Sequence, residues 1–133
     1  MSNRSYHTLH TQGVNHIWHD LKILPNGSGT PTIGEGDPNQ SYFSIARAGT
    51  GAFTLTTKDP FVALVDCIGT VVAGTQACWT FSRGQATKNA DNTFSIPFTI
   101  YNAGSAADLN AGTGAGTGSV DLIVVMRNSN VQP

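Results

Sequence analysis

Apolar and polar residues alternate along most of the chain from residue 41 onward, and this is the period of a half-buried β-strand. The clearest segment is 93–101, whose apolar positions all fall on one strand face: Phe94, Ile96, Phe98 and Ile100. Its other face carries hydroxyls and Pro97, which cannot donate a ladder hydrogen bond and therefore predicts an edge position or a bulge. Segment 120–127 repeats the pattern, with an inward face of Val120, Leu122, Val124 and Met126.

The middle of the chain predicts further strands separated by short turns. Residues 42–47 and 52–57 alternate on either side of a Gly-rich turn, which indicates a β-hairpin. The apolar, β-branched run 61–72 is read either as a buried strand or as a short turn followed by one. Residues 76–82 place three apolar side chains on one face: Ala77, Trp79 and Phe81. The stretch 84–92 is a polar turn, and 102–119 is a low-complexity loop.

The N-terminal third is less regular. Residues 1–24 are predicted as an extended arm that can include a first strand, because Ile17, Leu21 and Ile23 share one face and Trp18 points the other way. A helix is also compatible with residues 14–24, although the Pro25–Gly29 stretch would end it quickly. Residues 25–40 contain four Gly and three Pro and are predicted as a loop or extended connector, which leaves 41–133 as the β-sandwich domain.

Six to eight short strands without a persistent 3.6-residue period predict an all-β, antiparallel sandwich or barrel. A length of 133 residues fits one domain. The fold class is therefore expected to be a single β-sandwich preceded by an N-terminal arm.

The surface is unusually poor in charge. Asp, Glu, Lys and Arg make up 11% of the residues, against about 25% in an average soluble domain. Ser, Thr, Asn, Gly and Ala take their place, so much of the surface is expected to lie against other subunits. A net charge of −1 without basic clusters argues against nucleic acid as a partner. The sequence has no apolar run of membrane-spanning length and no signal-peptide core, so we expect no membrane partner and synthesis in a cytoplasm.

The histidines do not predict a metal site. His7 and His10, like His16 and His19, are three residues apart, so each pair would share a face on a helix but point to opposite faces on a strand. We favour a strand or arm here and expect no metal, although histidines clustered near one end can make assembly pH-sensitive.

Other catalytic signatures are missing as well. The Gly112–Gly118 stretch lacks the Lys-Ser/Thr of a phosphate-binding loop, and there is no G-x-S-x-G motif. Glu35 and Asp37 are expected to be solvated loop charges or, as the alternative, a weak chelator of a hard cation. Cys67 and Cys78 are expected to be free, buried thiols, or a disulfide if they lie on adjacent strands. The apolar surroundings of Cys67 should raise its pKa rather than activate it. We therefore predict no enzyme activity, no catalytic residues and no cofactor.

Three segments resemble small virion proteins of tailed bacteriophages, and most of all capsid decoration (cement) proteins. They are the Arg-x-Gly-x-Gly hairpin 43–56, the loop 25–31 and the final strand 119–127. The resemblance spans roughly residues 23–127 and lies in texture and order rather than in a strict motif. It implies a jelly-roll-like β-sandwich that forms homodimers or homotrimers. It also implies a place on the capsid exterior of the virion, bridging neighbouring major capsid subunits.

Contacts with such partners are expected from the arm and the start of the connector. The candidate interface residues are Tyr6, Leu9, His16, Trp18, His19, Pro25 and Asn26. Trp18 is the best anchor among them, because it is expected to face outward. Two other functions stay open: a carbohydrate- or receptor-binding sandwich, favoured if Trp18 and Tyr101 line one concave surface, and a cupin-like metalloenzyme that uses the histidines.

Overall fold

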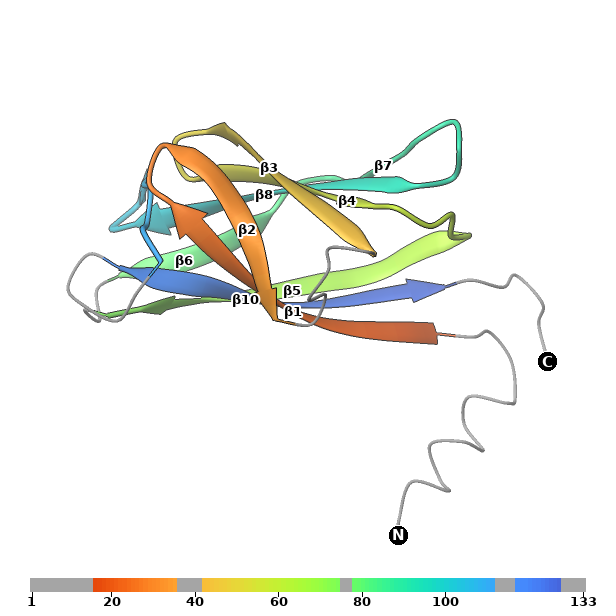
Figure 1. Ribbon diagram of the computed structural model, residues 1–133, viewed down its shortest axis with the longest axis horizontal. Coiled ribbons are helices and arrows are strands. Elements are labelled where there is room, and N and C mark those ends of the chain that lie inside the picture. The colour runs from red at the N-terminus through yellow and green to blue at the C-terminus, as the bar shows by residue number, and fades with distance from the viewer. Residues whose placement is uncertain (1–15, 36–41, 75–77, 112–116, 128–133) are drawn as a thin grey trace, which may run out of the picture.

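The protein, seen in a computed structural model, consists of two antiparallel β-sheets (Figure 1). The structure describes residues 16–35, 42–74, 78–111 and 117–127. Sheet A has the strand order β2-β1-β10-β5, formed by β2 (Gly29–Glu35), β1 (His16–Asn26), β10 (Gly118–Arg127) and β5 (Ala63–Ala73). Sheet B has the order β3-β4-β8-β6, formed by β3 (Phe43–Gly49), β4 (Ala52–Thr57), β8 (Phe94–Asn102) and β6 (Trp79–Arg83). Two short strands, β7 (Thr87–Lys88) and β9 (Ser105–Ala106), pair with β8.

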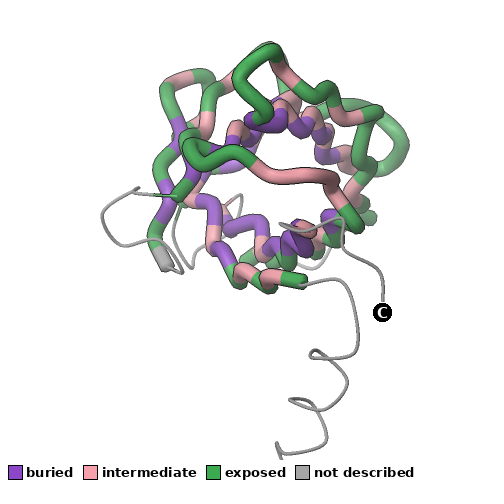
Figure 2. The backbone as a smooth tube through the Cα atoms, turned by 90° about the vertical axis from the view of Figure 1, so that its right-hand side faces the viewer, coloured by how far each residue is buried: buried purple, intermediate pink, exposed green. Residues whose placement is uncertain are grey.

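The all-β, antiparallel prediction is confirmed for these residues. The two sheets approach each other along both sides, because β2 lies against β3 and β5 lies against β6. Figure 2 shows the resulting layers, with buried segments in both. The described residues contain no helix, and therefore no helix long and apolar enough to cross a lipid bilayer.

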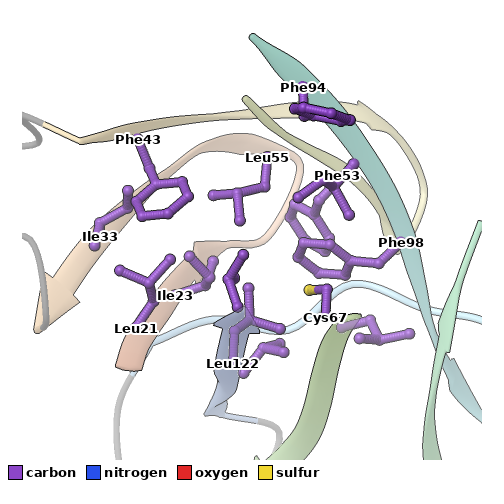
Figure 3. Close-up of a cluster of buried hydrophobic side chains, with 14 of the residues drawn as sticks. Leu21, Ile23, Ile33, Phe43, Phe53, Leu55, Cys67, Phe94, Phe98 and Leu122 are labelled. Carbon is purple, nitrogen blue, oxygen red and sulfur yellow. The ribbon is translucent and has the colours of Figure 1, made fainter. Parts of the chain in front are cut away.

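The core lies between the sheets and is formed by the predicted inward faces of β8 and β10. Every one of these eight apolar side chains is buried: Phe94, Ile96, Phe98, Ile100, Val120, Leu122, Val124 and Met126. The Phe98 ring stacks between Phe53 of β4 and Phe81 of β6, with centroid separations of 5.3 and 5.2 Å. Phe53 and Phe98 point from sheet B toward Cys67 and Leu122 of sheet A (Figure 3).

Within residues 16–35, the structure contains the possible first strand of the predicted arm, and a second strand replaces most of the predicted connector that it describes. Residues 16–26 form β1, which pairs with both β10 and β2 and so is an interior strand of sheet A. Residues 29–35 form β2, with Pro31 and Ile33 buried between exposed threonines. The Gly and Pro residues of this segment obscured its period-2 pattern, but an edge strand tolerates both residue types. Residues 1–15 and 36–41 lie outside the described part of the chain.

Pro97 lies in an interior strand rather than at an edge or in a bulge. In antiparallel pairing, the N–H and C=O groups of one residue point to the same neighbouring strand. The Pro97 carbonyl accepts a hydrogen bond from the Gly84 N–H at 2.7 Å, so its missing donor faces the same side. The partner leaves the ladder there, because β6 ends at Arg83 and β7 begins at Thr87. The proline therefore deprives no strand of a hydrogen bond.

The predicted loop 102–119 contains a structured segment that closes one end of the core. Leu109 is only 1% exposed and belongs to the hydrophobic cluster. Its carbonyl accepts the Gly27 N–H at 2.8 Å, and the Ala111 N–H donates to the Pro25 carbonyl at 2.8 Å. The segment is thus bonded to the β1–β2 turn, and a single leucine within a loop has no periodicity by which it could be predicted.

The apolar run 61–72 is not a fully buried strand. It forms most of β5, which pairs only with β10 in sheet A and has one inward and one outward face. Cys67 points into the core, whereas Val65, Ile68 and Val72 are exposed. This exposed apolar face is the first indication of an interaction surface.

Candidate interaction surfaces

The outer side of sheet A carries an apolar patch at one end. We call the outward-facing side of β1, β10 and β5 face A. Trp18 of β1 is 60% exposed there and pairs in register with Val125 of β10. Val125 is buried although it points away from the core. Next to it, Ile123 pairs directly with Ile68 of β5, and both are exposed. Contiguous exposed apolar side chains on a sheet face are typical of a contact surface.

A pocket lies at the other end of face A. It has a volume of about 440 Å³, and its described lining residues are Lys22, Leu24, Val72, Ala73, Gly74, Gly118 and Ser119. Leu24 can lie across β2 because Gly34 has no side chain; a Cβ atom there would come within 2.7 Å of Leu24 Cδ1. The pocket is therefore an apolar hollow in the same surface that carries Trp18.

Charged side chains separate the patch from the pocket. Lys22 Nζ lies 3.0 Å from Asp121 Oδ1, and the two residues face each other in the β1–β10 register. Asp20 is exposed beside them. Asp66 of β5 pairs in register with Val125, so it lies at the patch end of face A, where it accepts the Cys67 N–H at 2.7 Å.

The outer side of sheet B, which we call face B, carries no charged side chain among the residues described. Cross-strand registers align its hydroxyls and small residues across four strands: Ser44, Ala46, Thr54, Thr56, Thr80, Ser82, Ser95, Pro97, Thr99 and Tyr101. The alternation in segment 93–101 predicts that Thr93 also points outward, but Thr93 is buried, and its hydroxyl donates to Asp91 Oδ1 at 2.6 Å. The shortage of charged residues is thus greatest on face B rather than evenly spread over the described surface.

The predicted interface residues fall into three groups. His16, Trp18 and Asn26 are exposed on β1. His19 points between the sheets, with its ring 4.9 Å from that of Phe43, and Pro25 is buried, so neither is an open contact residue. Tyr6 and Leu9 lie outside the described residues, as do His7 and His10. Side chains alternate along a strand, and this explains why His16 and His19 point to opposite faces, as predicted.

The described residues offer no assembled reactive centre. They contain no group of three or more potential metal ligands. Cys67 and Cys78 are both free, as expected, and burial raises the pKa of the Cys67 thiol to about 11, so it is protonated at neutral pH. Cys78 is exposed, contrary to the expectation that both thiols are buried. Asp37 and most of the Gly112–Gly118 stretch lie beyond the part of the chain that the structure covers.

A polar contact that the sequence did not predict fixes the end of the sandwich. Asp108 contacts Arg47 of β3 with a closest N–O distance of 2.8 Å. The side-chain hydrogen bond from Arg47 holds the pKa of the Asp108 carboxyl below its ordinary value, and the bond from the Gly51 N–H adds to this effect. Arg47 and Gly51 are two members of the Arg-x-Gly-x-Gly motif. The motif was visible in the sequence, but its acidic partner 61 residues away was not.

Trp18 and Tyr101 do not line a common surface. Trp18 is on face A, and Tyr101 is on face B, opposite Thr80. The two aromatic side chains therefore cannot bind one ligand within a single chain, which removes the observation that would have favoured a carbohydrate-binding site.

No family model, curated protein or solved structure matches the chain, so the comparisons assign it to no family.

Proposed function

We propose that the chain is a structural, non-catalytic virion subunit that decorates the exterior of a bacteriophage capsid and stabilises it by bridging neighbouring major capsid subunits. The observation that supports this proposal is face B. Its hydroxyls can exchange water for hydrogen bonds to another protein at low cost, whereas buried charges carry a large desolvation penalty. A jelly-roll-like winding belongs to this proposal, and it is compatible with the crossings between sheets at β2–β3, β4–β5, β5–β6 and β9–β10.

Co-sedimentation of the purified protein with empty shells assembled from the major capsid protein of the same virus tests this proposal. We expect saturable binding with a fixed number of copies per shell. Thr54 lies at the centre of face B, between Ala46 and Pro97, so Thr54→Lys should abolish co-sedimentation by burying an unpaired charge. Ser28→Lys adds the same charge at an exposed turn and should bind normally. Failure of the wild-type protein to bind the shells would overturn the proposal.

A second candidate function is recognition of a glycan receptor. It is favoured by a pocket of about 250 Å³ at the β1–β2 turn, whose polar lining residues are Asn26, Thr30, Thr32 and Asn110. Amides and hydroxyls are the groups that hydrogen-bond sugar hydroxyls. Glycan-array binding that is lost in Thr32→Val would support this function, and an array without signal would exclude it for the glycans tested.

A further inference from the structure

The apolar patch and the pocket of face A are related as a protrusion and a cavity on one surface. Trp18 projects from β1 at one end, and Leu24 lines the pocket at the other. Both side chains point to the same side of the strand and are six residues apart, which corresponds to about 20 Å along β1. Trp18 therefore cannot reach the pocket of its own chain, but Trp18 of a second copy can occupy that pocket.

A twofold axis relates the two features. We consider two copies packed face A against face A, with the twofold axis in the plane between them. When this axis runs perpendicular to β1 and crosses that strand at Leu21, each position along β1 is reflected about Leu21. Trp18 then faces the partner's Leu24, and Asp20 faces the partner's Lys22. Because the operation is twofold, each Trp18 enters the other copy's pocket, so the contact closes on itself without leading to a filament.

The opposite charges of Asp20 and Lys22 on face A agree with this arrangement. Asp20 meets the partner's Lys22, whose ammonium already contacts Asp121 of its own chain, so one lysine lies between two carboxylates. At the Trp18 end, Arg127 has a buried Nε atom without a hydrogen-bond acceptor. The axis places Arg127 next to the partner's Asn26 and Thr117, whose side-chain oxygens can accept that hydrogen bond.

The size of the surface is within the lower range of specific interfaces. Face A has three strands, and β1 contains 11 residues. At about 4.8 Å between strands and about 3.4 Å per residue, its projected area is roughly 500 Å². Side-chain relief adds to this projected area, and a standard stable interface needs about 800 Å² per partner.

We propose that the protein forms a twofold dimer through face A, in which Trp18 of each copy occupies the pocket beside Leu24, Val72 and Ser119 of the other. The dimer leaves both copies of face B pointing outward. It thereby deepens the proposed function, because one dimer can bind two neighbouring capsid subunits, but it does not depend on capsid binding.

Light scattering on the purified full chain tests the oligomeric state. We expect the wild-type protein to have twice the chain mass of 13.9 kDa at micromolar concentration. Trp18→Lys and Leu24→Lys should each give a folded monomer with unchanged β-sheet circular dichroism, whereas Ser28→Lys and Thr54→Lys should remain dimeric. A wild-type monomer, or a Trp18→Lys variant that remains dimeric, would overturn the proposal.

Cysteine cross-linking distinguishes this axis from other dimers. The same rotation brings Asp66 of one copy to Val72 of the other, because both positions are three residues from Gly69, the register partner of Leu122. Facing positions on two packed sheets lie about 10 Å apart, which is too far for a disulfide but within the reach of a short bismaleimide. In a Cys78→Ser background, a mixture of Asp66→Cys and Val72→Cys proteins should therefore give a bismaleimide-linked dimer. Neither variant alone should do so, because like positions lie about 20 Å apart. Cross-linking of either single variant by itself, or none in the mixture, would refute the axis.

The two sets of experiments fail independently. Loss of the dimer without loss of shell binding would refute the face A interface alone. A stable dimer that ignores shells would refute the capsid function alone.

Discussion

The carboxylate of Asp108 holds the guanidinium of Arg47 at two points, with Nη2 2.8 Å from Oδ2 and Nε 3.3 Å from Oδ1. The same carboxylate accepts the Gly51 N–H at 2.8 Å. Gly51 itself has φ +64°, and a Cβ atom there would clash with backbone atoms of Ile100 and Ala107. Because Asp108 precedes the buried Leu109, this contact fastens the β3–β4 hairpin to the segment that closes the core.

Asp108→Asn should lower the melting temperature by several degrees at pH 7, because the paired charge is lost while an acceptor for Gly51 remains. The folded pKa of Asp108 lies below its ordinary value of 3.8. Its stabilisation is therefore fully present above pH 3.8 and is lost as the pH falls through the folded pKa. Thermal melts should show a constant gap between wild type and variant from pH 7 to 5, and a narrowing gap below pH 3.8.

Asp59→Asn is the matched control, because Asp59 is exposed and only its backbone carbonyl is bonded to Thr57. It should melt like the wild type. A gap between the wild type and Asp108→Asn that persists unchanged to pH 2.5 would contradict the charge-based explanation.

Thr57→Val should destabilise the fold by about 1–3 kcal/mol. The Thr57 hydroxyl is buried, accepts the Phe94 N–H at 2.9 Å and donates to the Asp59 carbonyl at 3.1 Å. Valine keeps the shape but leaves a buried N–H without an acceptor. Urea denaturation measures the effect, and Thr57→Ser, which retains the hydroxyl, should recover most of it. Equal losses in both variants would point to packing rather than to the hydrogen bond.

Gly69→Ala should cost about 1–3 kcal/mol, because overpacking forces neighbours out of place. A Cβ atom at Gly69 would overlap the ring of Phe81, which stacks on Phe98. Combining the change with Phe81→Leu should cost less than the sum of the two single changes in a double-mutant cycle. At Gly49 a Cβ atom meets nothing within 4 Å, so Gly49→Ala is the control. Strict additivity would show that the two positions do not share this space.

Only Cys78 should react with a thiol reagent in the native protein at pH 8. Cys78 is exposed, whereas Cys67 is buried and its pKa is about 11, so about one Cys67 in a thousand is a thiolate at that pH. Mass spectrometry of alkylated protein should find one label under native conditions and two in urea. Fast native labelling of Cys67 in a Cys78→Ser variant would contradict the burial of its side chain.

Local sequence was sufficient where alternation is unbroken. The inward faces of β8 and β10 and the hairpin β3–β4 could be predicted because a strand side chain has only two directions, so a run such as Phe94 to Ile100 specifies its own buried face. The outward position of Trp18 followed from the same rule applied to Ile17 and Leu21.

Where the pattern is interrupted, long-range contacts decided the structure. The edge strand β2 exists because Ile33 pairs in register with Ile23, although its two glycines and Pro31 indicate a loop. Leu109 is held in its buried position by two chain segments: the Gly27 N–H donates to its carbonyl, and the Gly51 N–H donates to the carboxylate of the preceding Asp108.

The candidate surfaces divide in the same way. Composition by itself established that the chain is poor in charge, because a count needs no geometry. That the hydroxyls gather on face B, and that Trp18 shares face A with a pocket, depends on which strands are neighbours. Strand order is set by contacts between residues far apart in the chain, and no local pattern encodes it.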